Sequence, residues 1–137
     1  CDLLILEGWC CGCKRINNNY LYKNINLIEK KFDKDFIWRN YYNKRLGNEY
    51  KKLFNLFEDK IFLKAPSFKY VLNWRIKQEK RNTTASIKYK KMNTDEIKLF
   101  IQHYEKITKW MLREFNRFAN LVIRIDKDQK IISVKKI

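Results

Sequence analysis

The sequence predicts an α/β fold with a mainly parallel sheet. Short apolar runs that are typical of buried strands occur at residues 2–6, 61–63 and 121–125. Between them, apolar residues recur every three or four positions, as they do on the buried side of a helix. Strands that alternate with helices indicate a sheet with helices packed on its faces. The 137 residues are enough for one domain, and 45% of them are hydrophobic, so a core can form.

The first expected strand, residues 2–6, ends in Glu7 and Gly8. Its apolar run predicts a strand that is buried between neighbours on both sides. Ligands of open α/β sheets bind beyond the carboxyl ends of the strands. A carboxylate there can hold Mg²⁺ or accept the proton of a substrate hydroxyl, so Glu7 is a candidate for either role. Gly8 would let the backbone approach a ligand closely. The alternative is an ordinary acid at a strand end.

The middle of the chain predicts two helical stretches and a strand. Apolar spacings of four, three and four predict a helix over residues 21–32, which the charged residues at 33–35 interrupt. A second stretch follows over residues 38–57, with a kink or turn expected at Gly47 and Asn48. The strand at 61–63 closes at Ala65 and Pro66.

The next helix, which Ser67 can cap, ends in a polar stretch that is a second site candidate. Phosphoryl transfer needs cations to offset the charge of the migrating group, and Arg75 could supply one from a helix that closes over the site. Residues 82–91 predict a mobile loop that suits a closing lid. The alternative is a solvated helix end with favourable spacing of Glu and Lys.

Asn93, with Glu96 three residues later, predicts a capping box at the start of a helix that runs to about Arg113. His103 and Glu105 flank the apolar face of this helix, and His103 could act as an acid, a base or a hydrogen-bond donor. A structural histidine is the alternative.

The chain closes with an expected strand at 121–125, a turn at 126–129 and a strand at 131–134, which adds an antiparallel edge to the sheet. No apolar run is long enough for a transmembrane helix, and no charged-then-apolar leader opens the sequence, so we expect a cytoplasmic protein without a membrane partner.

The net charge of +16 would suit a basic module that binds nucleic acid, because such surfaces release phosphate counterions. Lys, Asn and Ile, whose codons are AT-rich, are all abundant, and codon drift is the favoured explanation of the charge. Four tryptophans could be stacking platforms for single strands, but their spread favours core or pocket walls. These residues are Trp9, Trp38, Trp74 and Trp110.

The four cysteines all lie within the first 13 residues, at Cys1, Cys10, Cys11 and Cys13. A secreted disulfide framework spreads its cysteines along the chain. A zinc site takes its ligands in pairs from separate segments. We therefore expect reduced, half-buried thiols.

Four ordered motifs together resemble D-glycerate 3-kinases and their bacterial kinase-like relatives, which are P-loop kinases near uridine kinase and phosphoribulokinase. The first is Glu7-Gly8-Trp9-x-x-Gly12, which resembles the second acidic motif of that family. The other three resemble its strand-to-lid segment, its later helix and its final nucleotide-side strand. They are Ala65-Pro66-x-Phe68-x-x-Val71-Leu72-x-Trp74-Arg75-x-x-Gln78-Glu79, His103-Tyr104-Glu105-x-x-Thr108-x-Trp110 and Ala119-x-Leu121-Val122-Ile123-Arg124-Ile125-Asp126.

The resemblance implies a three-layer P-loop NTPase fold and transfer of the γ-phosphate of ATP, with Mg²⁺, to a hydroxyl of glycerate or a similar small molecule. Glu7 would take the metal or base position. Arg75 would take the lid position, with Gln78 and Glu79 beside it, and Gln78 and Arg81 would be further nucleotide-binding residues. Gly8, Trp9, His103 and Glu105 would lie near the acceptor. A related nucleoside kinase or ATPase is the alternative within this class.

The sequence departs from the family pattern in three ways. Cys13 stands where an aromatic residue usually follows Gly12, and Asn120 stands where Asp is common. No G-x-x-x-x-G-K-[ST] loop, which would hold the β- and γ-phosphates, occurs anywhere. We therefore expect residues 1–137 to be the C-terminal part of a single kinase domain, inactive alone, whose partner is the missing N-terminal half of the same protein. A split gene product and a decayed, inactive remnant are the alternatives.

Overall fold

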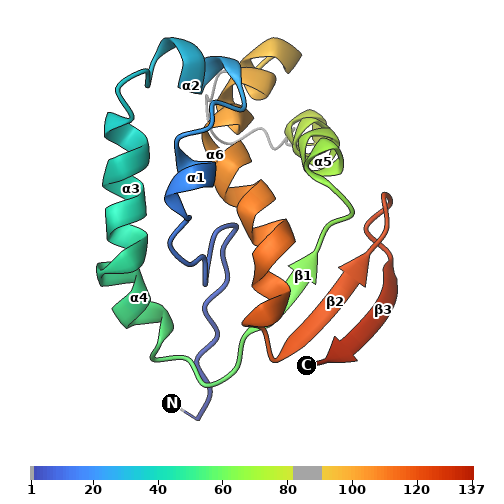
Figure 1. Cartoon of the computed structure of the whole chain (residues 1–137). Helices are drawn as coiled ribbons and strands as arrows, with labels where there is room; N and C mark the ends of the chain where they lie inside the picture. The colour runs from blue at the N-terminus through green and yellow to red at the C-terminus, as the bar shows by residue number, and fades with distance from the viewer. Residues whose placement is uncertain (1, 82–90) are drawn as a thin grey trace.

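The computed structural model describes residues 2–81 and 91–137. Figure 1 shows their arrangement. The helices are α1 (Asn18–Leu21), α2 (Leu27–Lys31), α3 (Ile37–Gly47), α4 (Glu49–Phe54), α5 (Phe68–Arg81), α6 (Thr94–Glu114) and the 3-10 turn η1 (Phe115–Arg117). The strands are β1 (Ile61–Lys64), β2 (Leu121–Ile125) and β3 (Ile131–Lys136).

The three strands form one sheet in the order β1-β2-β3. β1 runs parallel to β2, with Phe62 opposite Val122. β2 pairs with β3 in the antiparallel sense, with Ile123 opposite Val134. The expected α/β class and the antiparallel closing strand are confirmed. Because the described sheet has one parallel and one antiparallel pairing, it is mixed and not mainly parallel.

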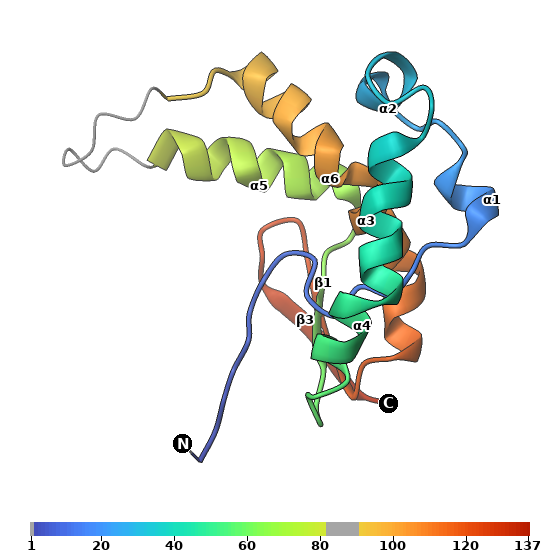
Figure 2. The ribbon, with the colours of Figure 1, turned by 90° about the vertical axis from the view of Figure 1, so that its left-hand side faces the viewer.

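The core lies between one face of this sheet and the C-terminal end of α6. The rings of Phe62 and Phe115 lie 4.8 Å apart, and Val122 is buried in the same cluster. Figure 2 shows α3, α4 and the end of α6 on this side of β1. Helices cover one face of the sheet within the described residues, so the expected third layer is not seen there.

The prediction of a buried strand at residues 2–6 is wrong for the chain as described. This segment has no strand structure. Leu3, Leu4 and Ile5 are exposed by 74%, 74% and 77% of their surface. A parallel strand is stable only between neighbours and under helices on both faces, and this segment is not a member of the described sheet.

The helix expected over residues 21–32 is replaced by a connection and one short helix, because α1 ends at Leu21 and α2 covers only Leu27–Lys31. The side chain of Asn17 accepts a hydrogen bond from the Tyr20 N–H and starts α1, and the side chain of Asn26 accepts one from the Glu29 N–H and starts α2. Each asparagine satisfies a free N–H at a helix start, which favours a new helix over continuation of the old one. The break expected at Gly47 and Asn48 is confirmed, between α3 and α4.

The capping box at the start of α6 is confirmed. The Glu96 N–H donates to Asn93 Oδ1 at 2.9 Å, and Glu96 Oε2 accepts from the Asn93 N–H at 2.7 Å. The loop expected at 82–91 lies, apart from Lys91, outside the described residues. None of the helices in the described part of the chain has the length and apolar character that crossing a bilayer requires.

Four buried charges join α2, α3 and α6. Arg39 on α3 donates from Nε to Asp33 at 2.7 Å, and its guanidinium lies 3.7 Å from Glu29 on α2. Lys106 on α6 lies 3.3 Å from the same Glu29 oxygen. All four side chains are exposed by 8% or less. Two cations and two anions therefore balance one another away from water, as buried charges require.

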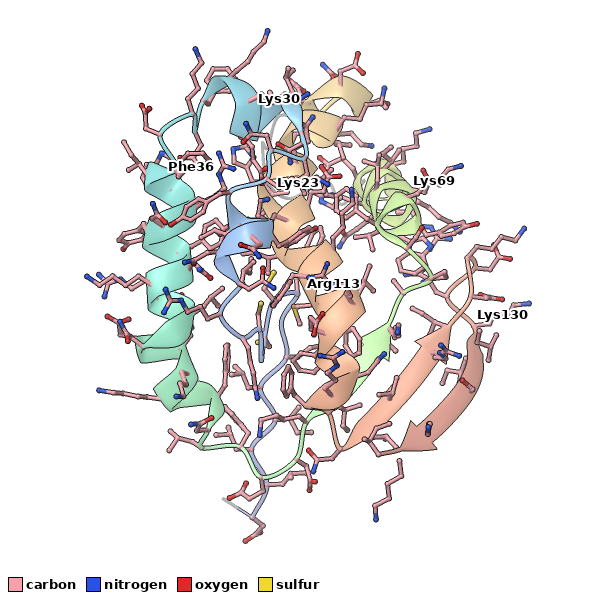
Figure 3. The ribbon with its side chains drawn as sticks, viewed as in Figure 1. Lys23, Lys30, Phe36, Lys69, Arg113 and Lys130 are labelled. Atoms are coloured by element: carbon pink, nitrogen blue, oxygen red, sulfur yellow. The ribbon has the colours of Figure 1, made fainter. Side chains whose placement is uncertain are left out.

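The same cations hold the loops around α1. Lys106 Nζ donates to the carbonyls of Tyr20 and Lys23, at 3.0 and 2.7 Å. Figure 3 shows Lys23 in the connection between α1 and α2, in front of α6. Arg39 donates to the Leu21 carbonyl at 3.3 Å. These bonds satisfy backbone oxygens where α1 ends and so fix an irregular segment.

We predict that Arg39→Met lowers the free energy of unfolding by about 3–5 kcal/mol, because it leaves the buried carboxylate of Asp33 without its cation and leaves Lys106 alone to balance Glu29. Urea denaturation followed by circular dichroism measures the change. The control is Arg45→Met on the same helix, which removes an exposed pair with Glu49. We expect little change there, since exposed pairs contribute little. Equal losses in the two variants would contradict a special role for the buried cluster.

Candidate functional site

A basic hollow of about 470 Å³ lies between α5, the N-terminal loop and the turn that joins β2 to β3. Three of its lining residues are cationic and none is acidic. The lining residues are Trp9, Val71, Trp74, Arg75, Lys77, Gln78, Arg81 and Gln129. Four of the residues that the sequence singled out therefore meet at one place: Trp9, Arg75, Gln78 and Arg81.

Trp9 forms the wall of the hollow opposite α5, and α6 holds it there. Its Nε1 donates to Thr108 Oγ1 at 2.9 Å. Its ring stacks on Tyr104, with centroids 5.1 Å apart. The Thr108 hydroxyl donates in turn to the Tyr104 carbonyl at 2.8 Å. Two motifs about a hundred residues apart in the sequence thus fix one indole ring. Trp9 remains exposed by 40% of its surface.

The opposite wall is α5, which the turn between β2 and β3 anchors. Trp74 Nε1 donates to the Lys127 carbonyl at 2.7 Å. Arg75 pairs with Glu79 one helical turn later at 2.7 Å, and both side chains are mostly buried. Glu79 also accepts from the Met92 N–H at 3.1 Å. The bonds from Arg75 and Met92 hold the pKa of Glu79 below its usual value, so this carboxylate stays charged and orients Arg75.

The charge of the hollow suits an anion. Lys77 and Arg81 lie one helical turn apart on α5, and both line the hollow together with Arg75. Their side chains share the hollow with the amides of Gln78 and Gln129, which can also donate hydrogen bonds. Guanidinium and ammonium groups beside indole rings can hold phosphate oxygens and a flat ring together.

Glu7 and Gly8 lie beside the hollow but do not line it. Glu7 is exposed at the end of the N-terminal segment. A Cβ atom at Gly8 would lie 2.8 Å from the Cys11 sulfur, so a larger residue here would have to displace the Cys11 side chain. No group of three His, Cys, Asp or Glu residues in the described ranges could hold a metal ion. A Mg²⁺ that is bound mostly through phosphates needs only one or two carboxylates, and Glu7 can supply one.

His103 and Glu105 do not join this hollow. His103 is exposed, and its Nδ1 lies 3.0 Å from the Phe100 carbonyl of the preceding turn. Glu105 accepts from Asn26 Nδ2 at 3.1 Å and pairs with Lys109 at 2.6 Å. Its carboxylate therefore links α6 to the start of α2.

A second hollow, of about 380 Å³, lies at the carboxyl ends of the parallel strands β1 and β2. Lys64 and Arg124, which are direct partners in the ladder, both line it, as do Tyr70 and Lys127. Burial lowers the pKa of Lys64, and the positive charge of Arg124 lowers it further. Sequence reasoning missed this hollow, because the pairing of Lys64 with Arg124 follows from the sheet register alone.

Gln129 is the residue of the first hollow that sequence reasoning missed. Lys77 belongs to the polar stretch that was the second site candidate, and Trp74 was expected as a core residue or a pocket wall. Gln129 lies in a turn with no motif of its own. The position of Trp74 one residue before Arg75 was the available signal, since its N–H reaches the Lys127 carbonyl and brings the turn to α5.

The loop between Glu7 and Ile16 carries three free thiols, of which Cys13 is buried and Cys10 and Cys11 are half-buried. The Cys13 N–H donates to the Cys10 carbonyl at 3.2 Å across a tight turn. Gly12 has a φ of +77° there, and a Cβ atom would lie 2.7 Å from the Phe115 ring. Burial raises the pKa of Cys10 to about 11 and that of Cys13 to about 12.

Comparison with known proteins gives one informative match. No protein-family model matches the chain, and no curated protein matches it. The fold is similar to a solved structure of D-glycerate 3-kinase from Cryptococcus neoformans var. grubii serotype A, with a TM-score of 0.66 and 18% sequence identity. The match covers 95% of this chain and 48% of that chain. The chain therefore has a kinase-like α/β fold and spans about half the length of the structure that it matches.

We predict that the folded protein protects Cys10 and Cys13 from iodoacetamide at pH 8, because only the thiolate reacts and a pKa near 11 or above makes it scarce. The rate of alkylation should rise by on the order of a hundredfold when urea unfolds the protein. Both thiols have a higher pKa in the folded protein than in the unfolded chain, so the free energy of unfolding should fall as pH rises above about 9. Mass spectrometry of the labelled peptides measures the rates. Equal rates in the folded and unfolded protein would contradict the burial of these thiols.

Proposed function

We propose that residues 1–137 form the C-terminal part of an ATP-dependent P-loop kinase that phosphorylates a hydroxyl of glycerate. The observation that carries the proposal is the basic hollow, which brings Trp9 of the first motif to Arg75, Gln78 and Arg81 of the second. The similarity of the fold to a D-glycerate 3-kinase supports it. The choice of glycerate as the acceptor rests on the four motifs and on the likeness to that kinase.

In this function the hollow binds the phosphates of ATP. Arg75, which Glu79 orients, and Lys77 and Arg81 offset the negative charge of the γ-phosphoryl group as it moves. The amide of Gln78 donates a further hydrogen bond. Because these residues lie on one helix, a shift of α5 would bring them to the phosphates together.

The reaction forms one bond and breaks one. The acceptor oxygen attacks the γ-phosphorus, the bond from that phosphorus to the β,γ-bridging oxygen breaks, and ADP leaves. Glu7 is the residue that we assign to the proton of the acceptor hydroxyl or to Mg²⁺, which when bound would neutralise phosphate charge. Trp9 closes the acceptor side of the hollow. His103 is a further candidate for contact with the acceptor.

The loop that holds the β- and γ-phosphates must come from other residues than these 137, because their sequence contains no Walker A motif. We therefore propose that residues 1–137 are one part of a single kinase domain and are inactive alone. Residues 82–91 belong to the lid side of the site in this proposal.

We predict that Lys77→Met weakens the binding of ATP to residues 1–137 roughly fivefold, the effect of about 1 kcal/mol for one lost charge-assisted contact. Quenching of tryptophan fluorescence measures the binding, because Trp9 and Trp74 line the hollow. The matched control is Lys69→Met on the same helix (Figure 3), which does not line it. If both variants lose affinity equally, ATP is held by the net charge and not by the hollow.

The proposed reaction is tested in a protein that joins residues 1–137 to the sequence encoded directly before Cys1. We expect ATP-dependent phosphorylation of D-glycerate, with little turnover of uridine. Glu7→Gln should lower kcat by at least about a hundredfold, as expected for a lost acid–base group, without changing the melting temperature, since Glu7 is exposed. Phosphorylation of uridine without phosphorylation of D-glycerate would show that the protein is a nucleoside kinase instead. No turnover of either acceptor would rule out the proposed function.

A further inference from the structure

One face of the sheet is apolar and open. Along β1 the buried Phe62 alternates with Ile61 and Leu63, which are exposed by 64% and 60%. The register places Leu63 beside Ile123, and Ile123 beside Val134, which is exposed by 58%. Side chains of directly paired residues lie on the same face. A row of three aliphatic side chains thus crosses all three strands on the face opposite the core.

This exposure is unusual for a sheet with a parallel pair. Parallel strands occur almost only where both faces are covered, because the crossover helices lie on them. In Figure 2 the helices α3, α4 and the end of α6 lie on one side of β1, and the N-terminal segment runs on the other side. No helix among the described residues lies along that second face.

The edge of the sheet is open at the same place. β1 pairs with β2 on one side and is the terminal strand of the sheet on the other. Its sequence, Ile-Phe-Leu-Lys, has no proline and no charge before Lys64. Edge strands that remain exposed are usually short, charged or bulged, and this one is short and carries a single charge, at its end. Its first three residues, which are all apolar, resemble those of an internal strand.

The N-terminal segment adds a third open apolar element. Leu3, Leu4 and Ile5 are the most exposed aliphatic residues of the chain as described, and Leu6 is exposed by 47%. Their sequence predicts a buried strand, which they do not form. The open face, the edge of β1 and this segment are all apolar and exposed. Burying them would take one additional layer of helices and at least one additional strand.

We propose that these three elements are the docking surface for a complementary half-domain, which the sequence encoded directly before Cys1 supplies. This polypeptide would place a parallel strand on the free edge of β1, cover Leu63, Ile123 and Val134 with helices, and bury residues 3–6. The inference rests on the proposed function only in assigning the phosphate-binding loop to the same half-domain.

Two observations favour this occupant over a second copy of the chain. The match to the solved kinase leaves 52% of that chain unmatched, since it covers 48%, so the similar fold contains a second part of comparable size. A copy of this chain, in contrast, would bring its own charge of +16 to the interface. Like charges of that size repel.

The test co-expresses residues 1–137 with a separately tagged polypeptide of the 137 residues encoded directly upstream of Cys1. We expect a 1:1 complex in size-exclusion chromatography with light scattering, and slower amide hydrogen exchange at residues 3–6 and 61–64 in the complex than in residues 1–137 alone.

The discriminating variant is Leu63→Glu, with Leu27→Glu on α2 as the matched control. Both leucines are exposed, by 60% and 47%, and α2 lies far from the sheet (Figure 1). We expect both variants of residues 1–137 to melt at the wild-type temperature. Leu63→Glu should weaken the complex by roughly tenfold or more, as a buried apolar anchor does, and Leu27→Glu should leave it unchanged.

Four outcomes would overturn the proposal: no coding sequence upstream, no complex, a complex that Leu63→Glu does not weaken, or a dimer of residues 1–137 that Leu63→Glu dissociates. The last outcome would assign the face to a second copy. A complex that forms as expected but transfers no phosphoryl group to glycerate or uridine would leave the docking surface standing and overturn only the proposed function.

Discussion

The ion pair of Arg39 with Asp33 is the interaction on which the N-terminal half of the fold depends. Residues 14–36 contain only two short helices, and neither could be stable alone. The guanidinium and the Lys106 ammonium hold this segment by its carbonyls and by Glu29. A hydrophobic cluster would pack such a segment without fixing its course, whereas hydrogen bonds from buried cations fix individual backbone oxygens.

Two of the helices that this cluster joins, α3 and α6, also position the candidate site, although no charged member of the cluster lies there. Asn43 on α3 bonds the Ile16 N–H and carbonyl, at 2.7 and 3.0 Å, and so holds the end of the loop that carries Trp9. From the other side, α6 holds Trp9 through Thr108. The hollow therefore depends on a frame of α3 and α6, while its cations come from α5.

The sequence was sufficient where the signal is local. Asn93 and Glu96 predict the start of α6, and the apolar residues at 61–63 and 121–125 predict β1 and β2. It failed at residues 2–6, because burial of a strand depends on neighbours that the described residues lack. It failed at Asn26, whose capping role was not recognised. For the site, the motifs selected Trp9 and Arg75, but only the fold shows that they share a hollow and that Glu105 serves α2 instead.

The net charge has a consequence for the open face. A protein that keeps Leu63 and Val134 in water, next to an unpaired strand edge, has the features that lead sheets to stack into insoluble fibres. A charge of +16 on 137 residues opposes this, because every encounter between two copies begins with long-range repulsion. The lysines then act as colloidal protection. They keep identical surfaces apart over distances at which an acidic or neutral partner of matching shape could still approach.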